Sequence, residues 1–327
     1  MNVAIVGCGL IGEKRAKNLG HHKLVGVADP VTAKAEKIAG LAGGACSVYA
    51  DWREAIDQEN VDLVVVATPN RFLAPVTKFA LQHRRHVLVE KPAARSAAEL
   101  DEVRRLAAQT DCRVMVGFSL RYHRAIRKAY EIYAQGALGD LMFIRARYGH
   151  GGRIGYDREW RADPELSGGG ELLDQGIHLI DLSRWFMGDF TEVYGFAPTY
   201  FWDMPVDDNG FVCLRNAAGK TAWLHASCTE WKNLFCLEVY GRYGKLQVDG
   251  LGGSYGVERL SYYKMLPEMG PPETMMWEYP GEDTSWRDEF ADFTDCIENK
   301  RPIGGDIEDA YAALRIVDEI YGRGHQA

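Results

Sequence analysis

The sequence predicts a protein of mixed α/β class with two domains: a parallel-sheet domain over residues 1–120 and an α+β domain with a mostly antiparallel sheet over residues 121–327. Up to Phe118, short apolar strands alternate with helical stretches, which is the pattern of a parallel sheet. From Glu192 onward the chain is instead a succession of strands and turns, which is typical of an antiparallel sheet. A length of 327 residues is enough for two domains that each have a hydrophobic core.

The chain begins with a glycine-rich turn between a strand and a helix. The apolar run Val3–Val6 leads into Gly7-Cys-Gly-Leu-Ile-Gly12, and a helical stretch follows as far as Leu19. Strand, G-x-G-x-x-G and helix together are the fingerprint of a dinucleotide-binding Rossmann fold, because the glycines let the backbone approach a pyrophosphate at the helix N-terminus. The candidate cofactor-binding residues here are Gly7, Gly9, Leu10, Ile11 and Gly12.

A second strand, Leu24–Ala28, ends in Asp29, twenty residues after Gly9. An acid at this spacing accepts hydrogen bonds from the adenosine ribose and repels a 2′-phosphate. We therefore expect NAD as the cofactor, with NADP as the less favoured alternative. Arg15 in the first helix is the residue that could reverse this preference, and a plain strand-end turn at Asp29 is the structural alternative.

The remaining strands of the first domain also end in polar residues. Helices are predicted over 32–40, from Asp51 with a capping box, through Leu81, and after a Ser96 cap. Between them, strand 63–67 is followed by Thr68-Pro69-Asn70, and strand 86–89 by Glu90-Lys91-Pro92; strand 113–118 is the last. Ligands bind at the carboxyl ends of parallel strands, so we expect Thr68, Pro69, Asn70, Glu90 and Lys91 to line the cofactor site, with Lys91–Pro92 a candidate cis peptide.

The second domain is organised around an apolar helix that follows Gly168-Gly-Gly170. A helix this apolar is normally buried, yet four of its residues form a different stripe at i, i+4, i+7 and i+11: Asp174, His178, Asp181 and Trp185. Buried polar groups pair with one another or face something polar. The stripe therefore indicates either a satisfied Asp–His pair in the core or a polar face turned toward a ligand.

The other elements of this domain are a helix over 121–135, a strand over 141–148 and a long polar loop over 149–166. Strands are predicted over 211–215, 222–227, 235–240, 245–248 and 259–264, then an irregular segment over 265–284 and helices over 285–299 and 306–321.

Composition excludes several classes of protein. The net charge is −8 without a basic run, which argues against nucleic acid as a partner, and no apolar segment approaches the ~20 residues that span a bilayer. Seven scattered cysteines without a C-x-x-C pair, in a chain that starts without a signal-peptide pattern, indicate reduced thiols and a cytoplasmic protein.

Taken together, the motifs resemble the Gfo/Idh/MocA family of oxidoreductases, which includes glucose–fructose oxidoreductase and inositol dehydrogenase. The resemblance rests on the glycine fingerprint, Ala67-Thr-Pro-Asn70, Glu90-Lys91-Pro92, Gly117-Phe-Ser-Leu-Arg121-Tyr122, Trp160-Arg161 and Gly168-Gly-Gly…Asp174-x-x-x-His178. It implies an NAD(P)-dependent dehydrogenase acting on CH–OH groups, in which Lys91, Asp174 and His178 line the site facing the nicotinamide. Relatives often carry histidine where this chain has Arg15 and Leu73.

The three residues suit alcohol oxidation. Histidine accepts a proton near neutral pH, and a lysine ammonium stabilises the developing alkoxide. Asp174 could either fix the tautomer of His178 or bind a neighbouring hydroxyl. Two other functions compete with this one. A nucleotide-sensing regulator would need the glycines but not the proton-transfer residues, and a metal on Asp174 and His178, with His150 or His225, would lack a ligand spacing. We expect no metal.

The loop over 150–163 leads into the polar-striped helix and is expected to wall the substrate site. The candidate substrate-binding residues are Tyr122, Arg153, Tyr156, Trp160 and Arg161. Its arginines, Arg158 included, favour an anionic sugar such as a nucleotide-linked hexose over a neutral cyclitol or free sugar, unless they pair with Asp157, Glu159, Asp163 and Glu165.

A homodimer or homotetramer is also expected. The second sheet carries more aromatic residues than one buried face needs: Tyr194, Phe196, Tyr200, Phe201, Trp202, Phe211, Trp223 and Phe235. The family resemblance implies pairing through this sheet.

Overall fold

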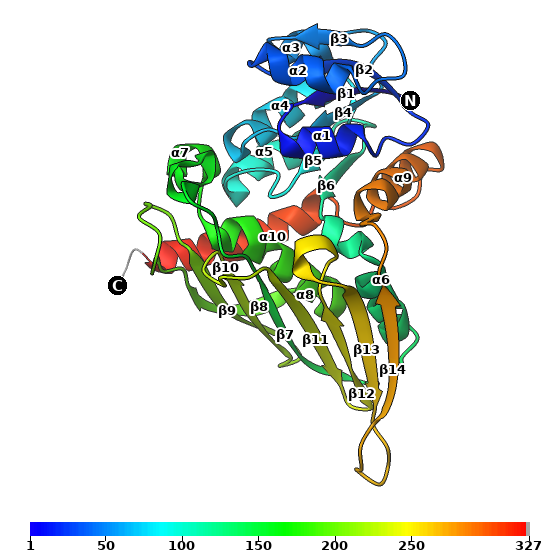
Figure 1. The fold of residues 1–327 in the computed structure, drawn as a ribbon, viewed down its shortest axis with the longest axis vertical. Helices are drawn as coiled ribbons and strands as arrows, with labels where there is room; N and C mark the ends of the chain where they lie inside the picture. The colour runs from blue at the N-terminus through cyan, green and yellow to red at the C-terminus, as the bar shows by residue number, and fades with distance from the viewer. Residues whose placement is uncertain (325–327) are drawn as a thin grey trace. The chain divides into compact units, whose positions relative to one another are not determined.

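A computed structural model of the chain describes residues 1–324 (Figure 1). The chain forms two compact units. Unit 1 comprises Met1–Phe118, Glu165–Gly168 and Trp286–Ala312; unit 2 comprises Ser119–Pro164, Gly169–Ser285 and the described chain from Ala313 on. The first boundary between the units lies between Phe118 and Ser119. Residues 286–312, however, were assigned to the second domain and fold with the first unit.

Unit 1 contains the parallel sheet that the strand–helix alternation predicts. Its six strands run in the order β3-β2-β1-β4-β5-β6, and every pair is parallel. The order reverses between β1 and β4, which is the point where such sheets bind ligands. The strands are β1 (Asn2–Val6), β2 (Lys23–Ala28), β3 (Ser47–Tyr49), β4 (Leu63–Val66), β5 (His86–Glu90) and β6 (Val114–Gly117).

The helices of unit 1 begin where the sequence carries capping residues. The Asp51 side chain accepts from Arg53 N, and the Ser96 side chain accepts from Glu99 N, so both predicted N-caps are confirmed. The helices are α1 (Leu10–Ala16), α2 (Thr32–Ala39), α3 (Trp52–Ile56), α4 (Asn70–Gln82) and α5 (Ala97–Ala107), and all but the first residue of α9 (Ser285–Glu298) belongs here too.

Unit 2 contains an eight-stranded sheet of order β14-β13-β12-β11-β7-β10-β9-β8. All neighbouring strands are antiparallel except β7 and β10. The strands are β7 (Leu141–Gly149), β8 (Phe190–Phe196), β9 (Asn209–Asn216), β10 (Thr221–Ser227), β11 (Leu234–Gly241), β12 (Gly244–Asp249), β13 (Glu258–Lys264) and β14 (Glu273–Tyr279).

One strand lies where the sequence predicted irregular chain. β14 pairs with β13, with Leu260 opposite Trp277, inside the segment that the proline, glycine and methionine content marked as irregular. β14 lies at the edge of the sheet, and its exposure alternates residue by residue, so one of its faces is more covered than the other. The composition of this segment correctly predicted the irregular turn before β14, but it did not predict the strand itself.

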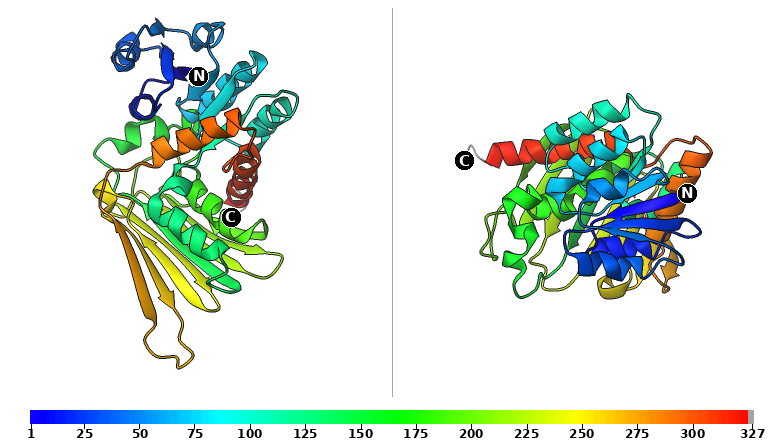
Figure 2. Two further views of the ribbon diagram at one scale, coloured as in Figure 1. Left: turned by 90° about the vertical axis from the view of Figure 1, so that its right-hand side faces the viewer. Right: turned by 90° about the horizontal axis from the view of Figure 1, so that it is seen from above.

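Helices α6 (Arg124–Ala134) and α8 (Ile177–Met187) cover one face of this sheet (Figures 1 and 2). Trp223, Tyr194 and Phe196 are each 57% exposed. Two other aromatic residues of the predicted surplus do not add to this exposed surface. Phe235 is buried, and the Trp202 indole donates to Cys228 O.

Candidate active site

The glycine turn of unit 1 has three glycines in three different settings. A Cβ on Gly7 would lie 2.4 Å from Ala67 O, and a Cβ on Gly12 would lie 2.0 Å from Gly7 O, so both positions exclude any side chain. Nothing in the described structure lies within 4 Å of a Cβ placed on Gly9. Close packing at the first and third glycines with open space at the second is what a pyrophosphate-binding turn requires.

Asp29 lies beside this turn at the end of β2. One of its carboxylate oxygens accepts from Cys8 N at 2.9 Å, and the other accepts from Val31 N at 2.8 Å. Since a carboxylate has about four acceptor positions, hydroxyl groups of a ribose could still bind it. Asp29 thus ties the end of β2 to the glycine turn through Cys8 N.

Arg15 does not lie open to a cofactor phosphate. Its guanidinium is 1% exposed, bonds Glu90 Oε1 through Nε at 2.7 Å, and lies 2.5 Å from Glu289 Oε2. It also stacks on the Trp286 ring, 4.4 Å from the centroid. Burial lowers the pKa of Arg15, but Glu289 and Glu90 raise it further, so the group stays charged. Arg15 is therefore a structural cation that joins α1, β5 and α9.

The residues that follow β4 and β5 differ in whether their side chains already have a hydrogen-bond partner. Thr68 Oγ1 is buried without a hydrogen-bond partner in the part of the chain that the structure describes, which suits a group that receives a ligand. Asn70 Nδ2 donates instead to Ser167 O at 2.8 Å. Glu90 is occupied by Arg15, and Lys91 follows it in the cis Lys91–Pro92 peptide, as predicted.

In unit 2, the helix that carries Asp174 and His178 begins with a wide turn. Residues Leu172–Gly176 form a π-helix, and α8 continues from Ile177. The π-turn changes the backbone hydrogen-bonding pattern at the residues that carry Asp174, directly before α8. Single π-turns within α-helices occur frequently at functional sites.

Asp207 holds the first residues of this turn. Its carboxylate accepts from Gly170 N at 2.9 Å, from Leu172 N at 2.7 Å and from the Tyr321 hydroxyl at 2.8 Å. A Cβ on Gly170 would lie 1.9 Å from Asp207 O, which explains why glycine precedes the helix. The C-terminal helix α10 (Ile307–Gly324) thereby supports the start of the helix through Tyr321.

The second half of the polar stripe is structural. Asp181 is 1% exposed and accepts two hydrogen bonds from Arg121, at 2.8 and 2.6 Å. Trp185 stacks on Tyr130 with ring centroids 3.8 Å apart. These two residues therefore have partners within the protein, Arg121 and Tyr130 rather than a histidine, and a ligand-facing role for Asp174 and His178 stays a prediction.

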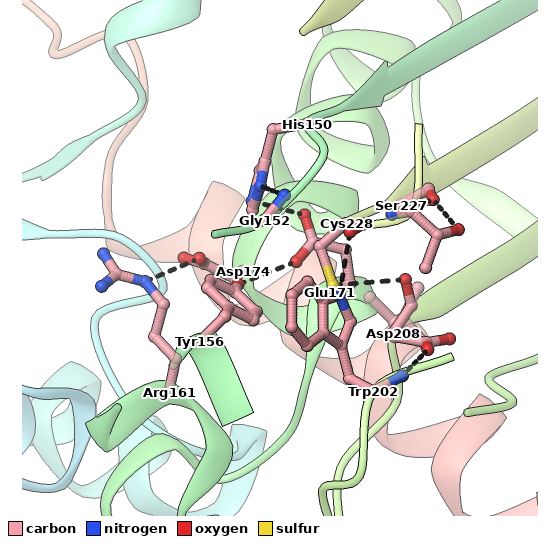
Figure 3. Close-up of polar contacts among 12 residues, drawn as sticks. His150, Gly152, Tyr156, Arg161, Glu171, Asp174, Trp202, Asp208, Ser227 and Cys228 are labelled. Carbon is pink, nitrogen blue, oxygen red and sulfur yellow. Dashed lines mark hydrogen bonds and ion pairs between the residues drawn. The ribbon is translucent and has the colours of Figure 1, made fainter. Parts of the chain in front are cut away.

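The loop before the helix reaches two carboxylates on it (Figure 3). Arg161 Nε donates to Asp174 Oδ2 at 3.1 Å, and the Tyr156 hydroxyl donates to Glu171 Oε2 at 3.4 Å. Burial, and then the charge of Glu171, raise the pKa of Tyr156 far above its ordinary value, so Tyr156 remains a hydrogen-bond donor. Of the substrate-binding candidates, the structure brings these two together.

The other three substrate-binding candidates, Arg153, Trp160 and Tyr122, have other contacts. Arg153 pairs with Glu159 at 2.7 Å and its side chain is 67% exposed, while the Trp160 ring lies 4.6 Å beneath the Arg161 guanidinium. Tyr122 is buried, with the Arg127 guanidinium 5.5 Å from its ring centroid.

Sequence analysis missed two tyrosines that share the surroundings of Asp174. The Tyr148 ring lies 6.0 Å from the His178 ring, and burial raises the Tyr148 pKa well above its ordinary value. Burial likewise raises the pKa of Tyr255 to about 12. Tyr255 lies in a glycine-rich turn after β12, and that local glycine density was the available signal.

Two classes of site can be tested against the described residues directly. Within residues 1–324, no group of three or more His, Cys, Asp or Glu side chains is arranged to hold a metal ion. None of the helices in that range is long and apolar enough to cross a membrane.

Comparison with known proteins identifies the family. Residues 1–118 match the model of the oxidoreductase family with an NAD-binding Rossmann fold, and residues 126–247 match the GFO/IDH/MocA C-terminal domain. An inositol 2-dehydrogenase from Saccharopolyspora erythraea is 30% identical over 77% of this chain and 75% of its own length. The chain belongs to the Gfo/Idh/MocA oxidoreductase family. The family resemblance seen in the motifs and the two-part fold are thus confirmed.

Other members span several sugars. An inositol 2-dehydrogenase from Rubrobacter xylanophilus is 28% identical over 97% of this chain and 88% of its own length. A levoglucosan dehydrogenase from Pseudarthrobacter phenanthrenivorans is 26% identical over 67% of this chain, and the match covers 59% of that protein. A solved levoglucosan dehydrogenase in complex with NADH and levoglucosan has the same fold, with a TM-score of 0.89, 21% identity and coverage of 100% of this chain and 97% of that one. The chain is an oxidoreductase of this NAD-binding sugar and cyclitol dehydrogenase family.

Proposed function

We propose that the protein oxidises a secondary hydroxyl of a neutral sugar, glycoside or cyclitol, with NAD as the hydride acceptor. The observation that carries this proposal is the charge on the helix that holds His178. Asp174 neutralises Arg161, and Glu171 adds a second carboxylate at the start of the same helix. Carboxylates accept hydrogen bonds from sugar hydroxyls and repel phosphates.

A nucleotide-linked sugar becomes the second candidate. The expectation of an anionic substrate rested on Arg153, Arg158 and Arg161. Arg153 pairs with Glu159, Arg158 lies 4.0 Å from Asp157, and Arg161 pairs with Asp174. The loop therefore balances its own positive charge, and a diphosphate would have to displace these carboxylates.

The chemistry assigns a role to each residue type. His178 takes the proton from the substrate hydroxyl, and Lys91 stabilises the alkoxide oxygen that results. Asp174, held by Arg161, accepts a hydrogen bond from a neighbouring hydroxyl and so orients the ring. The glycine turn, Asp29 and Thr68 would hold the cofactor, which supplies the hydride acceptor when bound.

A substrate panel tests the proposal. Free hexoses, methyl glycosides, inositols, sugar phosphates and nucleotide sugars are each assayed by NADH formation. We expect a neutral compound to exceed every phosphorylated one in kcat/KM by at least about tenfold. A nucleotide sugar as the best substrate would overturn the substrate assignment, and NADH binding without turnover of any compound would favour the nucleotide-sensing alternative.

The cofactor preference gives a separate prediction. We expect NAD to exceed NADP in kcat/KM by at least about tenfold, or about 1.4 kcal/mol, because Asp29 repels the 2′-phosphate and Arg15 is held by Glu90 and Glu289. Asp29→Ser should lower the ratio of kcat/KM with NAD to kcat/KM with NADP. Lys34→Ser, a substitution to the same residue in the next helix, should leave this ratio unchanged. A parent enzyme that prefers NADP would show that another residue reads the phosphate.

We also propose a homo-oligomer that forms through the exposed sheet face of unit 2. This face carries Trp223, Tyr194 and Phe196, and a hollow of about 420 Å³ is lined by Arg145, Phe211, Trp223, His225 and Glu238 among others. An apolar face of this kind is normally covered. Light scattering at micromolar concentration should report a dimer or tetramer, and Trp223→Asp should shift it toward the 36.6 kDa monomer. A parent protein that is monomeric at this concentration contradicts the proposal.

A further inference from the structure

Glu171 is a buried carboxylate that adds negative charge to the helix of His178, but the proposed chemistry gives its side chain no contact with the substrate. It is 1% exposed and directly follows the three glycines, at the point where the helix of Asp174 and His178 begins. Burying a carboxylate costs free energy unless hydrogen bonds compensate, so its surroundings indicate what it is for.

Three donors from two other segments surround this carboxylate (Figure 3). The Tyr156 hydroxyl lies 3.4 Å from Oε2, and His150 Nε2 lies 3.5 Å from Oε1. The Cys228 thiol follows β10, and burial, then the charge of Glu171, raise its pKa far above the ordinary value. Cys228 therefore remains a protonated thiol beside Glu171.

The tautomer of His150 follows from its second contact. Its Nδ1 accepts a hydrogen bond from Gly152 N at 3.0 Å, so that nitrogen carries no proton. The proton of the neutral ring is then on Nε2, which faces Glu171. The neutral His150 ring thereby accepts from Gly152 N through Nδ1 and directs its Nε2 proton toward Glu171 Oε1, which lies 3.5 Å away, longer than an ordinary hydrogen bond.

His150 and Tyr156 both belong to the loop that carries Arg161. The outer side of this loop is open to solvent, with Ile154 fully exposed and the Arg158 side chain 87% exposed. At the start of the loop, His150 N donates to Ser227 O and His150 O accepts from Glu230 N. From Arg153 onward the backbone hydrogen bonds within the loop are short-range turns, such as Tyr156 N to Arg153 O. The side-chain contacts of the loop with Glu171 and Asp174 join it to the helix.

We infer that Glu171 is a positioning residue for substrate binding: it anchors His150 and Tyr156, and through them places Arg161 against Asp174. This inference rests on the proposed function, because the pair it places is the one that orients the sugar. Loss of the anchor should weaken sugar binding without touching the residues that transfer the proton or hold the cofactor.

The test compares Glu171→Gln with Glu258→Gln. Glu258 is a matched control because it is a buried carboxylate of the same unit, 6% exposed, which accepts from Ala125 N at 2.5 Å and lies 3.1 Å from His123. We expect Glu171→Gln to raise the KM for the sugar at least about tenfold, the effect of losing charge-assisted hydrogen bonds, with the Kd for NADH unchanged. Glu258→Gln should lower Tm and leave KM at the parent value.

Two further readouts separate anchoring from general stability. Trypsin should cut after Arg153 and Arg158 several-fold faster in Glu171→Gln than in the parent or in Glu258→Gln, and this measurement needs no turnover. The single variant Tyr156→Phe should raise the KM for the sugar. Adding Tyr156→Phe to Glu171→Gln should raise this KM no further. Equal KM values for Glu171→Gln and the parent, additive KM effects, or unchanged trypsin rates would each overturn the inference. Failure of the whole substrate panel would instead concern the proposed function, since the trypsin result stands without it.

Discussion

Replacing His178 with alanine is expected to lower kcat by about 10²–10⁴-fold, because the variant loses the group that accepts the proton of the substrate hydroxyl. His178 is 5% exposed and lies on α8 close to the Tyr148 ring, so the change removes a side chain from a packed setting. NADH binding should persist, since the glycine turn and Asp29 belong to unit 1. Single-turnover kinetics and NADH fluorescence measure the two quantities separately.

Lys91→Met should show the same separation, with a lower kcat and a retained Kd for NADH, because the alkoxide loses its cation. His225→Asn is the control: His225 lies on β10, bonded to Asn209 at 2.9 Å, and has no part in the proposed chemistry. A His178→Ala enzyme that turns over at the parent rate between about pH 6 and 9 would show that another group is the base.

The second large effect concerns stability. Arg15→Met is expected to lower the free energy of unfolding by about 3–5 kcal/mol, because it leaves Glu90 and Glu289 buried without their shared cation. Urea unfolding followed by circular dichroism measures the change. Lys17→Met is the control two residues further along the chain, since the Lys17 side chain is exposed and solvent screens its pair with Glu13.

A double variant sharpens this prediction. Arg15→Met with Glu289→Gln removes the cation and one of the two carboxylates, so it should recover part of the loss seen in Arg15→Met alone. If the single variant were as stable as the parent, the buried triad would not be the element that joins α1, β5 and α9.

Local sequence signals were sufficient for unit 1. Gly7 and Gly12 have no room for a side chain, and the central strand β4 is apolar throughout because both of its faces are covered. The caps at Asp51 and Ser96 depend on neighbours two or three positions away. Patterns of this kind can be read from a single sequence.

Features that depend on distant residues were not predictable in the same way. The π-turn at Leu172–Gly176 depends on Asp207 and Tyr321, which lie far along the chain. The polar stripe therefore looked uniform, although Asp181 and Trp185 pair within the protein with Arg121 and Tyr130. Glu171 was overlooked because its donors, Tyr156, His150 and Cys228, come from separate segments.

The contact between Arg15 and Glu289 also bears on how the protein is made. The two residues are separated by 274 positions, and nearly all of unit 2 is translated between them. When the six parallel strands have left the ribosome, the Arg15 guanidinium and Glu90 are present but α9 has not yet been synthesised. A nascent chain that ends at Phe118 contains every glycine of the fingerprint and still lacks Trp286 and Glu289. The nucleotide-binding unit therefore reaches its final packing only late in translation, after the chain that forms the antiparallel sheet has been made.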